Sequence, residues 1–156
     1  MTVAFVLALM LAISPIAPKT NDAQGFAQAI ARVVSTATLP EGVSRPMAAA
    51  LIVQYAWDEG RFSLRASRGD HGAARCALQV HTGDWAESSP EACVRAGWYV
   101  MMASYKLCGD ASGFCGSCRL VAGEYASRFA VAISDRRVYK AQGLLDAVVM
   151  RAERER

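Results

Sequence analysis

One predicted helix constrains the fold of this chain more than any other segment. Ser44 and Pro46 are typical of a helix cap and first turn, and residues 47–57 that follow are almost all apolar. Because such a helix has no polar face, other elements must surround it. It ends at residues 58–60, where Gly60 is typical of a helix C-terminus. We therefore expect a helical domain built around this segment.

Further helices are predicted on both sides of it. Apolar residues recur at helical spacing from Asp22 to about Ala37, and Ser89-Pro90-Glu91 has the cap, proline and acid of a third helix that runs to Cys108. Two more helices are expected near 117–133 and 134–154, whereas residues 61–88 are polar and glycine-containing. The 156 residues suit one domain. The expected fold class is α+β, predominantly α-helical, with a small irregular or β lobe after the second helix.

The N-terminus begins with an unbroken apolar run from Val3 to Ile13. This run is too short for a membrane-spanning helix and has the length of a signal-peptide core. We expect residues 1–18 to be a signal peptide or membrane anchor and residues 19–156 to be the functional domain. A buried N-terminal helix is the alternative, and an uncleaved leader would attach the domain to a membrane through residues 3–17.

The cysteine count agrees with export. Five cysteines in a short exported chain predict two disulfides and one free thiol. We expect Cys76 to pair with Cys93, and Cys108 to pair with Cys115 or Cys118. A zinc site or a redox C-x-x-C pair at the last two cysteines is the alternative.

Glu59 is the leading candidate for chemistry. It closes the apolar helix, next to Asp58 and at the negative end of the helix dipole, with Trp57 and Phe62 nearby. This setting favours a carboxylic acid that keeps its proton, which is what a general acid in glycosidic-bond cleavage requires. The alternative is an ordinary solvated helix terminus.

Three segments support the first interpretation through a family resemblance. Glu59-Gly60-Arg61-Phe62 resembles the E-S-R-F motif of lytic transglycosylases and goose-type lysozymes, and Ala77-Leu78-Gln79-Val80 resembles their G-L-M-Q-I segment. Residues 109–113 fall where the family has an A-Y-N-A-G turn, with Asp110 in place of the tyrosine. The resemblance implies a lysozyme-like fold, peptidoglycan as substrate, no cofactor and no metal. It also implies Glu59 as the catalytic residue, with Gln79 and Ser67 in the substrate groove.

The expected activity is therefore that of a lytic transglycosylase, which breaks the MurNAc–GlcNAc β-1,4 bond of peptidoglycan with Glu59 as general acid and base. A hydrolase would need a second carboxylate, for which Asp70 and Asp84 are the candidates. The alternative is an inactive lysozyme-like module that binds glycan or serves in a larger assembly. The net charge of +3 is too small for a nucleic-acid reader. We expect the periplasm or cell envelope as location, or a virion if the chain is encoded by a bacteriophage, with virion or secretion-assembly partners.

Overall fold

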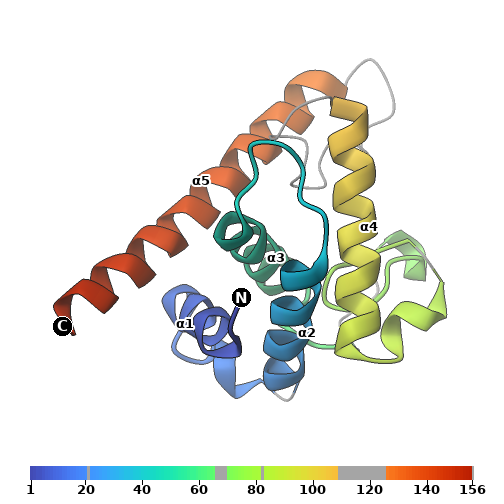
Figure 1. The fold of residues 1–156 in the computed structure, drawn as a ribbon. Coiled ribbons are helices and arrows are strands. Elements are labelled where there is room, and N and C mark those ends of the chain that lie inside the picture. Colours follow the sequence, from blue (N-terminus) through green and yellow to red (C-terminus); the bar gives the residue numbers. More distant parts are fainter. Residues whose placement is uncertain (21, 66–69, 82, 109–125, 156) are drawn as a thin grey trace.

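The structure is a computed structural model that describes residues 1–20, 22–65, 70–81, 83–108 and 126–155. These residues form five α-helices (Figure 1): α1 (Val3–Ile13), α2 (Ala23–Thr36), α3 (Arg45–Gly60), α4 (Pro90–Cys108) and α5 (Ala126–Arg154). Short 3-10 turns cover Ala17–Lys19, Asp70–Gly72 and Asp84–Glu87. The predominantly helical prediction is confirmed.

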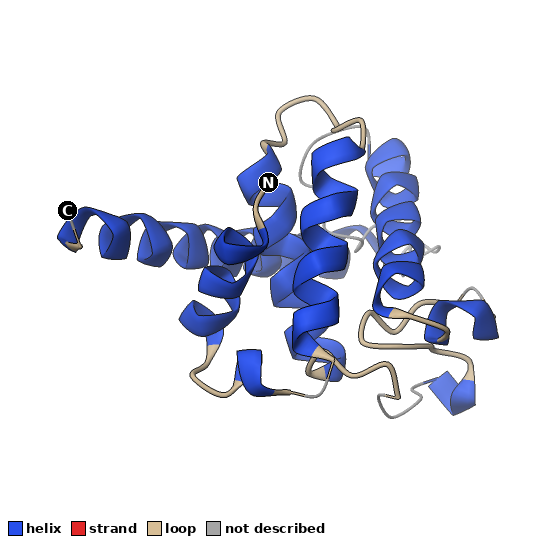
Figure 2. Ribbon diagram, turned by 60° about the horizontal axis from the view of Figure 1, so that its bottom comes forward, coloured by secondary structure: helices blue, strands red, loops and turns tan. Residues whose placement is uncertain are grey.

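The lobe between α3 and α4 contains less β structure than the sequence suggested. Within the described ranges there is no sheet, and strand-like pairing is limited to one antiparallel bridge between Arg75 and Val80. Two 3-10 turns and irregular loops make up the other residues of the lobe that the structure describes, as Figure 2 shows. Of the two expected forms of the lobe, the described residues therefore show the irregular one, and their single bridge does not amount to a β lobe.

Helix α3 lies at the centre of the helical body, as its apolar sequence requires. Every residue from Ala48 to Ala56 is buried, and α1, α2 and α5 all pack against the helix. The Ser44 hydroxyl accepts a hydrogen bond from the Met47 amide at 3.3 Å, which confirms the predicted cap. Figure 1 shows α3 enclosed between the N-terminal helices and the long α5.

The end of α3 differs from the prediction by one residue. Gly60 is still helical, and the left-handed conformation falls on Arg61 (φ 50°) and Phe62 (φ 56°). Each such residue costs about 1–2 kcal/mol of backbone strain. The fully buried Phe62 ring compensates for this cost by packing 5.7 Å from the ring of Trp57 and 6.1 Å from that of Phe26. Tertiary packing, rather than a glycine, therefore sets the turn.

Helices α4 and α5 complete the body. The Ser89 hydroxyl caps α4 by accepting from the Ala92 amide at 3.1 Å, as predicted. The break expected between helices near 117–133 and 134–154 is wrong, because α5 runs without interruption from Ala126 through Ser134 to Arg154. No glycine or proline stands at residues 133–134 to interrupt it. Residues 117–125 of the first expected helix lie outside the described residues. The C-terminal end of α5 projects away from the other helices (Figure 1).

Helix α1 packs inside the fold. Its Val6, Leu9 and Met10 side chains are fully buried, and the helix contacts α2, α3 and α5. The Met1 amino group donates to the Ser35 hydroxyl of α2 at 2.8 Å. In the part of the chain that the structure describes, no helix is both long and apolar enough to span a bilayer. Removal of residues 1–18 and their use as an anchor remain predictions.

Candidate functional site

Glu59 lies in the last turn of α3, with its side chain 37% exposed. Its Oε1 atom accepts a hydrogen bond from Nη2 of Arg137 at 3.1 Å. The carboxylate thus faces a cation of α5 instead of the apolar surroundings that the sequence suggested.

Two cations of α5 meet the two acids at the end of α3. Beside the Glu59–Arg137 pair, Nζ of Lys140 lies 2.7 Å from Oδ2 of Asp58. The Arg137 guanidinium also stacks on the Tyr55 ring, 4.0 Å from its centroid, and its side chain is only 14% exposed. Sequence reasoning missed these partners because they are distant in the chain. The only available signal was the spacing of three between the two cations on a predicted helix, which places them on one face.

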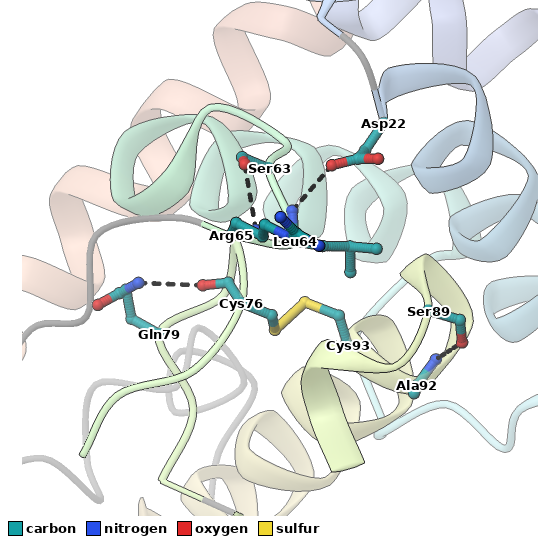
Figure 3. The surroundings of a disulfide bond; sticks show 9 residues. All are labelled: Asp22, Ser63, Leu64, Arg65, Cys76, Gln79, Ser89, Ala92 and Cys93. Atoms are coloured by element: carbon teal, nitrogen blue, oxygen red, sulfur yellow. Dashed lines mark hydrogen bonds between the residues drawn. A yellow bond between two sulfur atoms is a disulfide. The ribbon is translucent and has the colours of Figure 1, made fainter. Parts of the chain in front are cut away.

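A hollow of about 830 Å³ opens beside the turn that follows α3. Arg61 is one of its lining residues, with its guanidinium 4.3 Å above the Trp57 ring. The Asp22 carboxylate, which also lines the hollow, accepts from the Leu64 amide at 3.0 Å and ties the turn to the start of α2 (Figure 3). The lining residues are Thr20, Asp22, Arg61, Phe62, Ser63, Leu64 and Arg65. Glu59 is not among them, although the hollow begins two residues after it.

Gln79 occupies a constrained position in the lobe. Its backbone is left-handed (φ 46°), and its side-chain amide donates to the Cys76 carbonyl at 3.0 Å (Figure 3). Cys76 forms the predicted disulfide with Cys93 of α4. Leu78 lies between Cys76 and Gln79 in the sequence, and its fully buried side chain packs directly over Gly97 of α4. Two anchors to one helix therefore hold Gln79 in place.

Backbone strain concentrates in this region. In the described ranges, the non-glycine residues with positive φ all lie between positions 61 and 79: Arg61, Phe62, His71, Cys76 and Gln79. Strained residues of this kind cluster at functional sites, where the surrounding structure holds them. The segment that links Glu59 to Gln79 is therefore the part of the molecule with the most specialised backbone.

The structure describes only some of the remaining predicted residues. Ser67, Asp110 and the partners expected for Cys108 fall outside the described residues, as does the segment 109–113. Asp84 is exposed, and its Oδ1 accepts from Nε of Arg75 at 2.7 Å. Asp70 begins a 3-10 turn. Across the described ranges, no group of three potential ligands could hold a metal ion.

The chain matches no protein-family model, no curated protein sequence and no solved structure. Its candidate function therefore depends on the residues and contacts described above.

Proposed function

We propose that this chain is a lysozyme-like, peptidoglycan-cleaving domain that acts as a lytic transglycosylase through Glu59. The observation that carries the proposal is the placement of Glu59 in the last turn of the buried helix α3. The turn that follows is fixed by the Phe62 ring and opens into a hollow large enough for sugar rings. Gln79 is held in the adjoining lobe by the disulfide and by its own bond to Cys76.

The reaction needs one protein carboxyl group. Protonated Glu59 donates its proton to the glycosidic oxygen O4, which joins MurNAc C1 to GlcNAc C4, and the C1–O4 bond breaks as the acetamido oxygen of the same MurNAc bonds to C1. The Glu59 carboxylate then accepts the proton of the MurNAc C6 hydroxyl, whose oxygen replaces the acetamido oxygen at C1. The product is an anhydro sugar, the enzyme regains its proton, and no water is consumed.

The contacts of Asp84 favour this route over hydrolysis. A hydrolase uses a second carboxylate beside the scissile bond, either to activate water or to attack the sugar. The Asp84 carboxylate instead accepts from Arg75 at the surface of the lobe, with its side chain 81% exposed. A carboxylate this exposed is not enclosed beside a scissile bond, which favours the mechanism that needs one protein carboxyl group.

A second function, an inactive glycan-binding or assembly module, is favoured by the Glu59–Arg137 pair. That pair engages one oxygen of Glu59 with a side chain of α5, and Glu59 does not line the hollow beside the turn. In this case Gln79 and the hollow would bind a glycan strand without cleaving it. The Cys76–Cys93 disulfide is compatible with export in either case. We propose the cell envelope, or a virion, as the location.

The experiment that separates these functions is a digest of purified peptidoglycan by the oxidised wild type and by Glu59→Gln. Glu41→Gln is the matched control, since it makes the same change at an exposed residue before the start of α3. The proposal predicts soluble muropeptides from the wild type and Glu41→Gln, and a loss of about 100-fold or more in Glu59→Gln. Equal release by all three proteins would contradict the assignment of Glu59, and binding without release would support the inactive module.

A further inference from the structure

Arg137 is joined to Glu59 from the opposite end of the chain, 78 residues later. We propose that Arg137 is a positioning residue, which holds the Glu59 carboxyl group in the orientation needed for proton transfer. This inference rests on the proposed function and adds to it a residue that no sequence motif marks. It assigns to α5 a role at the site beyond covering α3.

The geometry makes the arginine the fixed partner of the pair. Its guanidinium is stacked 4.0 Å from the centroid of the Tyr55 ring, which belongs to the buried part of α3. The Arg137 side chain is 14% exposed and that of Glu59 is 37% exposed, so the arginine is the more enclosed of the two. A planar guanidinium held against a ring loses little further freedom when it forms a hydrogen bond. Arg137 can therefore fix the rotamer of the glutamate.

The contact also distinguishes the two carboxyl oxygens of Glu59. Arg137 donates to Oε1 of Glu59 at 3.1 Å. Oε2 has no hydrogen-bond partner among the residues that the structure describes. Because Arg137 fixes Oε1, it also fixes the direction in which Oε2 points. We assign Oε2 as the atom that carries the proton to the glycosidic oxygen and later takes one from the C6 hydroxyl.

The charge of Arg137 acts in the same direction during the first step. Negative charge develops on the Glu59 carboxyl group as its proton moves to the leaving oxygen. A guanidinium already in place stabilises that charge without reorganisation, which lowers the barrier rather than improving substrate binding. Loss of Arg137 should consequently appear in kcat and leave KM nearly unchanged.

Lys140 provides a matched control in the same interface. It lies one turn after Arg137 on α5 and pairs with Asp58 at 2.7 Å, so it contributes a similar ion pair between α5 and α3. Its ammonium group bonds Asp58 rather than Glu59. If the α5 cations serve only to fasten the helix, Lys140→Met and Arg137→Met should have the same effect.

The test measures kcat and KM for muropeptide release by wild type, Arg137→Met, Arg137→Lys and Lys140→Met, with thermal melts of each protein. We expect Arg137→Met to lower kcat by about 10- to 100-fold with KM within about 3-fold, as a displaced catalytic group does. Arg137→Lys should regain part of kcat, because it restores the charge without the planar stack. Lys140→Met should stay within about 3-fold of wild type in both constants.

The outcomes separate this role from the proposed function. A wild type that releases nothing removes the function and this role with it. An active wild type with kcat unchanged in Arg137→Met, or reduced equally in Lys140→Met, overturns the positioning role and leaves Glu59 in place. If Arg137→Met does not fold, Arg137→Lys decides: a reduced kcat at constant KM supports the role, and a wild-type kcat refutes it.

Discussion

The close approach of the lobe to α4 yields the sharpest prediction about stability. Gly97 is buried in the interior of α4, and a methyl group added there would lie 2.3 Å from Cδ1 of Leu78 and 3.3 Å from its Cγ. Leu78 is fully buried, so its side chain has no open space into which to move. Overpacking of this kind costs about 1–3 kcal/mol. The gain in helix propensity from glycine to alanine offsets about 1 kcal/mol of that cost.

A control on α5 isolates the steric part. A methyl group at Gly143 would meet no atom within 4 Å, so Gly143→Ala gains the propensity without the clash. We expect Gly143→Ala to raise the free energy of unfolding by up to about 1 kcal/mol and Gly97→Ala to lower it by up to about 2 kcal/mol. Urea denaturation of the oxidised proteins, followed by circular dichroism, measures both.

A double-mutant cycle then identifies Leu78 as the obstacle. Leu78→Ala alone should cost about 2–5 kcal/mol through the cavity it leaves. In the Gly97→Ala protein the same change should cost at least about 1 kcal/mol less, because the new methyl group occupies part of that cavity. Equal shifts for Gly97→Ala and Gly143→Ala, or additive effects in the cycle, would refute the packing of the lobe against α4.

Three further perturbations probe other parts of the fold. Cys76→Ser together with Cys93→Ser opens a loop with a sequence separation of 17. Chain entropy predicts that the free energy of unfolding, measured by urea denaturation, falls by about 3 kcal/mol. An unchanged midpoint would contradict this prediction. Hydrogen bonding from Arg95, followed by the charges of Arg32 and Arg95, holds the pKa of Glu91 below its ordinary value. A carboxylate with a lowered pKa stabilises the fold at a pH above its ordinary pKa, and this stabilisation is lost as the pH falls and the group is protonated. Glu91→Gln should therefore lower the melting temperature at pH 7 and have no effect at about pH 2. The same change in melting temperature at both pH values would contradict the ion pair. Leu9→Ala should lower the free energy of unfolding by about 2–5 kcal/mol in protein that retains α1. An unchanged free energy of unfolding in protein recovered after export would show that α1 has been removed.

Local sequence signals predicted the helix starts well. Ser44 and Ser89 each bond the amide three residues later, because a cap depends on residues within one turn of it. The central burial of α3 also followed from its sequence, since a helix without a polar face has to be enclosed. The cysteine spacing, in contrast, only limited the pairings, and Cys76–Cys93 was one expectation among several arrangements.

Features set by tertiary contacts could not be read from the sequence. Asp22 stands at the start of α2, yet its carboxylate bonds the Leu64 amide, 42 residues away, instead of an amide of the helix. The left-handed turn was expected at Gly60 because glycine adopts it without cost, whereas packing of the Phe62 ring places it one residue later. Apart from its spacing from Lys140, Arg137 carried no signal in the sequence, because its role depends on where α5 crosses the end of α3.

The same limit applies to the surroundings of Glu59. Its position at the end of a buried helix was predicted, but the sequence suggested an apolar setting, and the structure places a guanidinium there. A neighbour of this kind cannot be recognised before the fold is known, since long-range ion pairs leave no periodic pattern.

The central claim, that Glu59 drives cleavage without water, is tested most directly by digesting peptidoglycan in heavy-oxygen water and weighing the muropeptides. We expect anhydro products that contain no solvent oxygen, formed by the wild type and lost in Glu59→Gln. Products that carry one solvent oxygen would contradict it, because they would show a hydrolase that uses a second carboxylate.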